Sequence, residues 1–457
     1  MTPWGFQAWR AYEGEQEGLR RRLTRPDGSA HVRAAVSTRP SETAEAPPEL
    51  LAALAPPPPG PAVAFVLRLG HALHRHGTPA HRLEGLMQRV SERLGLEARF
   101  FSTPTSIFAS FGPPEDLRTS LIRVEPGDMD LERLILLDML ADDVIQGRLT
   151  PSEGATRVEA ILARPQRYGP ALQLLCWMLA GASAAILFGG GWKEMGVAGF
   201  SSLCIGLVDL ATRKQPTTAR VLEPVAAVLS AAFAGIAAHS FGPLHGEVAT
   251  LAGLIVLLPG LTLTIAVNEV ATRNLISGTS RLTHAALVFL QLGFGAALGS
   301  RVATVLPPLP VGPLPTVLPT GTAVAALVVA GFAIAVLFRA RPRDWGWIAL
   351  AGAAAFGGAR LGTLLLGPQL GAFVGALLLG IGSNALARLR NRPSVTTVVP
   401  GLMLLVPGSV GFRSLASLLE RDVVAGVDTA FSMLLVAVAL AAGLLSANAI
   451  MPPRKVL

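Results

Sequence analysis

The chain has 457 residues, of which 51% are hydrophobic and only 15% are charged. This composition excludes an ordinary soluble protein and is typical of a polytopic membrane protein. Arg in short loops accounts for the formal net charge of +8, so no nucleic-acid partner is expected.

The acidic residues are concentrated in the first third of the chain. Of the 30 acidic residues, 21 precede Ala171, which predicts a water-facing segment followed by a membrane part. No apolar stretch follows the first residues, so no cleavable signal peptide is expected. Cys176 and Cys204 lie in apolar segments and are interpreted as small buried hydrophobes rather than a disulfide.

Residues 1–60 are rich in Pro, Ala and charge and are predicted to be a disordered tail and linker. A small cytoplasmic α+β domain is predicted over 61–170, with helices beside a three-stranded sheet. Gly77 is expected to end the first helix, Thr78 to cap the second, and Thr150 with Glu153 to form a capping box for the last. The predicted helices are Ala62–His76, Pro79–Leu94, Asp130–Gln146 and one from Thr150 to before Pro165; the predicted strands are Glu97–Thr103, Ser106–Phe111 and Arg118–Val124.

Four histidines of this domain, His71, His74, His76 and His81, fall within eleven residues and raise a metal-site hypothesis. There is no nearby Cys and no His-Glu-x-x-His spacing. We therefore interpret them as partly exposed helix histidines, and expect neither a metal nor another cofactor.

Ten apolar segments follow Pro170, each long enough to cross a bilayer. Their approximate spans are Ala171–Gly189, Met195–Ala211, Val221–His239, Val248–Val270, Leu282–Val302, Thr322–Phe338, Trp345–Leu366, Gln369–Ala387, Thr396–Leu418 and Thr429–Ala449.

The fourth and ninth segments contain matching Pro-Gly elements, Gly253–Gly260 (GLIVLLPG) and Gly401–Gly408 (GLMLLVPG). Pro259 and Pro407 are 148 residues apart, and this offset also relates the starts of the first five segments to those of the second five. Because five is odd, the two halves must have opposite orientations, as in the inverted repeats of secondary transporters. The predicted parts are a first repeat over 171–305, a Pro-rich outer loop over 306–320, a second repeat over 321–450 and a tail over 451–457.

The loop charges predict the orientation of the chain. With the N-terminus inside, 16 Lys and Arg residues flank the inner ends of the segments and five flank the outer ends. The α+β domain and both termini are therefore expected in the cytoplasm.

A Pro-Gly break near the middle of a membrane exposes backbone groups that suit a polar substrate. The N–H groups of a helix that resumes after the break favour a carboxylate, and nearby hydroxyls can bind a small polar ligand. The alternative is a structural kink in which the threonines bond back to their own helix. The candidate substrate-binding residues are Pro259, Gly260, Thr262, Thr264, Pro407, Gly408 and Ser409.

Acidic residues inside the membrane are the candidates for proton coupling. Glu269, preceded by Asn268, is the first choice because it lies about nine residues beyond the first break. Asp209 and Glu223 are further candidates, although an interfacial ion-pair network with neighbouring arginines is the favoured interpretation of these two.

Several separated motifs resemble the threonine/serine exporter family. They are Gly70–Glu84 (GHALHRHGTPAHRLE), Phe101–Phe108 (FSTPTSIF), the Leu258-Pro259-Gly260 stretch with Ser277-Gly278 and Arg281-Leu282, and Leu405–Gly408 with Gly411-Phe412. The resemblance extends over about residues 62–449. It implies a non-enzymatic secondary transporter in a bacterial-type plasma (inner) membrane that exports threonine and serine, driven by the proton motive force, with a cytoplasmic N-terminal domain.

Two other interpretations of the N-terminal domain stay open. It could be a hydrolase, anchored by the membrane part, in which the turn Thr103–Ser106 and the histidines supply nucleophile and base. It could instead regulate or cap the transporter through Arg82 and Glu84, next to the motif residues Thr103 and Thr105.

Overall fold

The computed structural model describes residues 60–453, apart from 214, 216, 217, 219, 304–317, 391, 406, 407, 420 and 421. The predicted tail over 1–60, the Pro-rich loop over 306–320 and the tail over 451–457 lie outside this described part except at their edges. Pro407, a candidate substrate-binding residue, also lies outside it.

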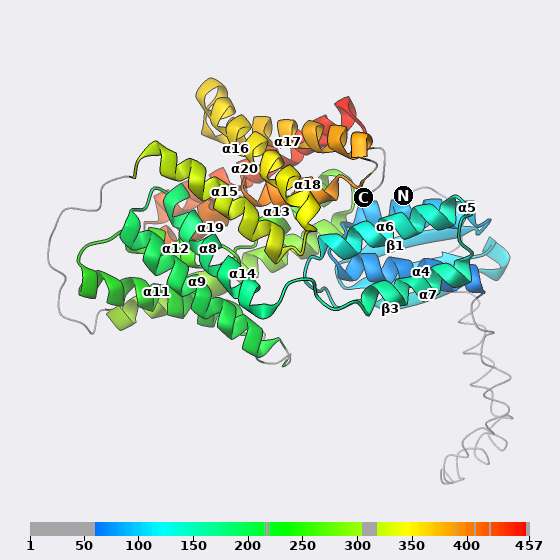
Figure 1. The fold of residues 1–457 in the computed structure, drawn as a ribbon, viewed down its shortest axis with the longest axis horizontal. Coiled ribbons are helices and arrows are strands. Elements are labelled where there is room, and N and C mark those ends of the chain that lie inside the picture. The colour runs from blue at the N-terminus through cyan, green and yellow to red at the C-terminus, as the bar shows by residue number, and fades with distance from the viewer. Residues whose placement is uncertain are drawn as a thin grey trace, which may run out of the picture. The chain divides into compact units, whose positions relative to one another are not determined.

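The N-terminal part up to α7, called the N-terminal domain below, combines helices with one sheet (Figure 1). Its three strands pair antiparallel in the order β1-β2-β3, with Thr103 opposite Ser106 and Phe108 opposite Leu121. The strand predictions are confirmed to within one residue at each end. The elements are α4 (Pro61–Arg75), α5 (Ala80–Arg93), β1 (Ala98–Thr103), β2 (Ser106–Phe111), a short 3-10 helix (Pro114–Asp116), β3 (Arg118–Arg123), α6 (Leu131–Ile145) and α7 (Pro151–Leu162).

Local sequence signals account for most of these helix ends. Thr150 and Glu153 form the predicted capping box at the start of α7. Gly77 follows the last turn of α4 with φ +87°, a conformation that glycine adopts without strain. One expectation is wrong: α5 begins at Ala80, and the Thr78 hydroxyl caps nothing, since it has no hydrogen-bond partner among the described residues.

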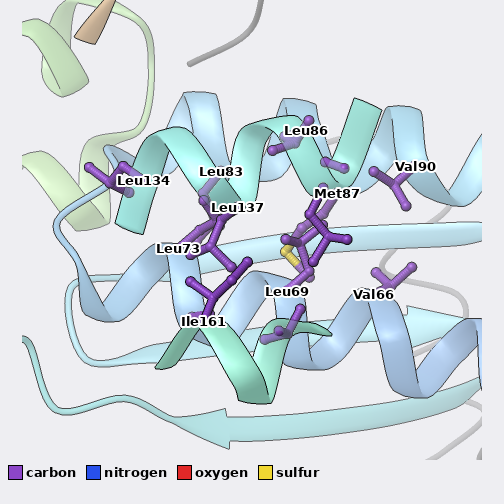
Figure 2. Close-up of a cluster of buried hydrophobic side chains, with 14 of the residues drawn as sticks. Val66, Leu69, Leu73, Leu83, Leu86, Met87, Val90, Leu134, Leu137 and Ile161 are labelled. Atoms are coloured by element: carbon purple, nitrogen blue, oxygen red, sulfur yellow. The ribbon is translucent and has the colours of Figure 1, made fainter. Parts of the chain in front are cut away.

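The core of the domain lies between its helices, as Figure 2 shows for Leu73, Leu83, Met87 and Leu137. All four side chains are fully buried, and each such side chain contributes about 1.5–3 kcal/mol through removal from water. Gly70 on α4 permits this packing, because a Cβ atom there would lie 2.5 Å from Met87 Cε. The α4 and α5 faces are thereby held in close contact.

The membrane part consists of apolar helices. Eight helices of the described chain are long and apolar enough to cross a membrane by length and composition, and two shorter ones are also apolar. The protein is therefore a polytopic helical membrane protein. The helices are α8 (Pro170–Leu187), α9 (Trp192–Thr212), α11 (Leu222–Phe241), α12 (Gly246–Gly253), α13 (Gly260–Ala271), α14 (Leu275–Ala303), α15 (Thr320–Leu337), a short 3-10 helix (Pro342–Asp344), α16 (Trp345–Leu366), α17 (Pro368–Arg390), α18 (Val395–Met403), α19 (Gly408–Leu419) and α20 (Val423–Ile450).

Small residues bring neighbouring membrane helices close together. Gly295 and Gly299 of α14 face α11, and a Cβ atom on either would lie within 2.4 Å of an α11 carbonyl oxygen. Gly362 of α16 packs in the same way, with a Cβ there 2.9 Å from the Cα of Gly371 on α17. Spacing of small residues by four is the usual way to achieve backbone contact between helices in lipid, where the hydrophobic effect does not drive association.

Both predicted Pro-Gly breaks occur in the structure, where α12 ends before α13 begins and α18 ends before α19 begins. At the first break, carbonyls in the last turn of α12 accept hydrogen bonds from neighbouring helices: Ser202 on α9 donates to Gly253 O (2.8 Å), and Ser230 on α11 donates to Thr250 O (3.0 Å). Gly253 leaves space for this contact, since a Cβ there would lie 2.4 Å from Ser230 Oγ. Protein groups thus replace the water that is absent at this depth.

Buried histidines make the stability of the N-terminal domain depend on pH. Burial, together with the nearby charge of Arg82, lowers the pKa of His81 from 6.5 to about 4. Between those values the unfolded chain binds a proton that the folded domain does not, so stability is present above pH 6.5 and is lost as the pH falls towards 4.

We expect the full-length protein in detergent to melt at a lower temperature at pH 5 than at pH 7.5. Lowering the pH from 7.5 to 5 costs the wild type about 2 kcal/mol of folding free energy through His81. His81→Asn has no imidazole to protonate, so the melting temperature of this variant should fall less over the same interval. Parallel losses in the two proteins would contradict the assignment.

Candidate functional site

A cavity of about 130 Å³ lies where the two broken helices meet. The first break contributes Ile255, Val256 and Leu258, and the second contributes residues on both sides of its own gap. Helices α8 and α15 complete the wall. The second-break residues and the remaining lining are Met403, Leu404, Gly408, Ser409, Ala180, Ala184, Leu187, Phe188, Ala330, Ile334, Leu337 and Phe338.

The cavity is mostly apolar, with polar groups at one place. Helix α19 begins at Gly408, so its first backbone N–H groups have no intrahelical acceptor and carry the positive end of the helix dipole. Ser409 adds a hydroxyl to the same wall. A small ligand with a carboxylate and an apolar or hydroxylated side chain matches these groups.

Only some of the candidate substrate-binding residues predicted from the sequence line this cavity. Gly408 and Ser409 line the cavity, whereas Gly260 and Thr262 lie just beyond Leu258, outside its lining. Pro259 occupies the N-cap position of α13. Thr264 does what the kink hypothesis expects, since its hydroxyl donates to Gly260 O at 3.0 Å within its own helix.

Glu269 is fully buried near the end of α13 and accepts three hydrogen bonds. Its Oε2 accepts from Ser277 Oγ (2.9 Å) and from Arg281 Nε (3.1 Å), both on α14. Its Oε1 accepts from the backbone N–H of Ala80 at 2.9 Å. Since Ala80 is the first residue of α5, a carboxylate of the membrane part caps a helix of the N-terminal domain.

This cap takes the place of the local one that Thr78 does not provide. A negative charge at a helix N-terminus also interacts favourably with the helix dipole. Gly278 positions the partner helix, because a Cβ there would lie 2.6 Å from Val270 Cγ2 and 2.8 Å from Ala266 O on α13. The residues Ser277-Gly278 and Arg281 thus build the pocket of the Glu269 carboxylate.

A second contact joins the N-terminal domain to the turn between α15 and α16. The Leu131 N–H at the start of α6 donates to Phe338 O at 3.0 Å. Arg339, buried in the turn, pairs with Asp128 at 2.8 Å and lies 3.6 Å from Asp130. This contact and the one between Ala80 and Glu269 lie at the same end of the membrane helices, which we call the domain end.

The motif residues of the N-terminal domain connect α5 to the sheet. Glu84 on α5 accepts from the N–H (2.6 Å) and the hydroxyl (2.9 Å) of Ser102 on β1. Burial raises the pKa of Glu84, and the charge of Glu269 acts in the same direction. Thr103 shares a 2.7 Å hydrogen bond with Ser106, and Thr105 O accepts from the N–H of Val124.

Arg82 lies on the same helix as Glu84. It is partly exposed and makes no hydrogen bond or ion pair with any residue that the structure describes. Its role as a gating residue stays a prediction.

The histidines bond to backbone carbonyls. His74 Nε2 lies 2.7 Å from Thr103 O, and His76 Nδ1 lies 3.4 Å from Asp128 O. Burial lowers the pKa of both side chains. The described residues contain no group of His, Cys, Asp and Glu placed to hold a metal ion. The hydrolase hypothesis needs a His nitrogen against a hydroxyl, but His74 Nε2 contacts a carbonyl oxygen instead.

The other two coupling candidates make no hydrogen bond or ion pair with the described groups around Glu269. Asp209 pairs with Arg213 one helical turn away at 2.7 Å, as the ion-pair interpretation expects. Glu223 is in the first turn of α11, partly buried, and has no hydrogen bond or ion pair to another described residue.

Comparison with protein families decides the class of this molecule. The model for a putative threonine/serine exporter matches residues 64–303, and a second threonine/serine exporter model matches residues 323–450. The chain belongs to the threonine/serine exporter family. The first match covers the N-terminal domain and the first break, and the second covers the second break.

The curated relatives that the chain matches are fungal membrane proteins. Pheromone-regulated membrane protein 10 of Saccharomyces cerevisiae is 31% identical over 246 residues, covering 52% of this chain and 31% of that protein. The protein of the same name from Eremothecium gossypii is 26% identical over 369 residues, covering 77% of this chain and 48% of its own length. The chain thus spans less than half the length of these relatives. No solved structure matches it.

We expect Glu269→Gln to loosen the N-terminal domain. The substitution leaves Arg281 without its buried partner, which costs roughly 3 kcal/mol. Hydrogen exchange of the segment 78–93 should rise and the melting temperature of the full-length protein should fall. Asp209→Asn is the matched control, because its ion pair is partly exposed and contributes less than about 1 kcal/mol. Equal effects of the two variants would contradict the capping role.

Proposed function

We propose that this exporter moves small hydroxy amino acids, threonine and serine, out of the cytoplasm, and that they bind in the cavity between the two broken helices. The observation that carries the proposal is that both breaks line one cavity of about 130 Å³. A secondary transporter typically binds its substrate at such a place, between half-helices of two related repeats.

The chemistry of the cavity supports this class of substrate. The amino-acid carboxylate binds the free N–H groups at the start of α19, and Ser409 bonds to the ammonium or the hydroxyl group. The apolar wall accommodates the methyl group of threonine. The small volume disfavours large side chains, and the family models that match the chain are described as threonine/serine exporters.

We further propose a ten-segment arrangement of two inverted five-segment repeats, with α12–α13 and α18–α19 each forming one broken segment. The domain end then faces the cytoplasm of a bacterial-type cell, and both termini lie there. Two observations support this orientation: Arg281 and Arg339, on the predicted inner flanks, both contact acids at the domain end.

Glu269 is our candidate for proton coupling. Protonation neutralises its charge, which removes the ion pair with Arg281 and weakens the cap on α5. Since α13 runs from the first break to Glu269, over about 14 Å at helical rise, a proton bound at the domain end can change the position of α13 and, through it, of the break residues that line the substrate cavity. Such a link between protonation and conformation is what proton-driven transport requires.

Filling the cavity tests the substrate site. Ala330→Leu places a larger side chain in the wall contributed by α15 and should lower the initial rate of serine efflux from reconstituted vesicles about tenfold. Ala325→Leu is the control, because Ala325 is on the exposed face of the same helix. A normal rate in a correctly folded Ala330→Leu protein would place the substrate elsewhere.

Imposed pH gradients test the coupling. Wild-type efflux of labelled serine or threonine should accelerate under a gradient, while Glu269→Gln should exchange the amino acid but ignore the gradient. Asp209→Asn and Glu223→Gln should respond as the wild type does. If one of these two loses the response and Glu269→Gln keeps it, the coupling role moves to that residue.

A further inference from the structure

A second, larger pocket lies at the domain end of the second half. Its volume is about 510 Å³, within the range of small-molecule sites. The short 3-10 helix before α16, the helices α16 and α17 and the first turn of α18 form its walls. None of its residues belongs to the cavity described above.

The pocket carries an excess of positive charge. Arg392 is paired with Asp344, whereas Arg343 and Arg390 have no ion pair with any other part of the described chain. The Arg390 guanidinium lies 5.0 Å from the ring centre of Trp347, which orients it. Two available guanidinium groups are well suited to a carboxylate or a phosphate.

Two buried polar atoms in the same walls lack partners. Asp344 and Ser383 are only 3% and 2% exposed, and Asp344 Oδ2 and Ser383 Oγ have no hydrogen-bond partner in the described structure. Burying such groups is costly unless a ligand bonds to them. The carboxylate oxygen requires a donor such as an ammonium group, and it would repel a simple anion. The ligand must therefore carry an acidic group and an ammonium group together, and a hydroxyl group would complete it.

Helix α18 connects this pocket to the central cavity. Thr396 and Thr397 in its first turn line the pocket, and Met403 at its last turn lines the cavity. The nine residues of α18 extend over about 14 Å. The two sites are thus separate but share one helix.

We propose that the pocket is a loading site for a zwitterionic hydroxy amino acid on the cytoplasmic side, separate from the central cavity. The proposal rests on the export function proposed above. Arg343 and Arg390 bind the carboxylate, Asp344 accepts from the ammonium group, and Ser383 bonds to the hydroxyl group. Capture there raises the local concentration of substrate at the mouth of the transporter.

The test uses the full-length protein in phosphatidylcholine vesicles, with labelled serine presented to either face. Arg390→Gln and Ser383→Ala should raise the half-saturating serine concentration about tenfold when serine is presented on the domain side, with the maximal rate within about twofold of wild type. Presented from the other face, serine should give wild-type kinetics. A substitution that acted only through the fold or the central cavity would change both directions.

Arg388→Gln is the matched control. It removes the same charge from the same helix, but Arg388 lies outside the pocket and bonds to Pro452 O. Its kinetics should equal those of the wild type. Wild-type kinetics in both Arg390→Gln and Ser383→Ala would overturn the loading site.

An aminophospholipid head group has similar chemistry and supplies the competing explanation. If wild-type transport rises on adding phosphatidylethanolamine while all variants behave alike in phosphatidylcholine, the pocket is a lipid site and the proposal is overturned.

A binding measurement separates this proposal from the export function. If the wild type transports neither serine nor threonine, the export function fails, and equilibrium binding of labelled serine to the protein in detergent decides the pocket. Binding that is lost in Arg390→Gln and kept in Arg388→Gln supports it, and equal or absent binding in all three overturns it.

Discussion

The hydrogen bonds and ion pair of the buried Glu269 carboxylate are the interactions on which the arrangement of this protein most depends. A buried charged side chain is tolerated only when it is paired and fully hydrogen-bonded. Glu269 meets that condition by using partners from two parts of the fold: Ser277 and Arg281 from α14, and the Ala80 N–H from the N-terminal domain. Removing any partner leaves a costly group behind, so the three elements are held together.

The same constraint explains why the N-terminal domain has its particular motifs. Glu84 and Ser102 join α5 to β1, so a displacement of the α5 start is transmitted to the sheet. On the other side, Asp128 and Asp130 hold Arg339 in the turn after α15. The domain is therefore attached to both halves of the membrane part through charged contacts, which respond to protonation more than apolar contacts do.

The broken helices show how a membrane protein tolerates free backbone groups. Two carbonyls before the first break accept hydrogen bonds from serines of neighbouring helices, whereas the N–H groups at the start of α19 adjoin the cavity. One set of groups is used for stability and the other is available to a ligand. The cavity and the pocket that holds Arg343 and Arg390 lie at the two ends of α18, so this one helix contributes residues to both.

Much of this molecule follows from local sequence. The capping box at Thr150, the alternation in β1–β3 and the Pro-Gly breaks depend on residues close together in the chain, and they occur where the pattern predicts them. The hydrogen-bond partners of residues far apart in the chain could not be predicted from the sequence. Thr78 resembled a helix cap, yet the cap of α5 is Glu269, 189 residues from Ala80. Thr264 resembled a substrate ligand, yet its hydroxyl is used within its own helix.

The sequence by itself thus determined the class of protein, the secondary structure and the positions of the breaks, because periodicity and turn chemistry act over a few residues. Only the tertiary structure decided which groups share a cavity and which partner each buried charge has. Those outcomes depend on the packing of helices distant in the chain, and no spacing along the sequence records it.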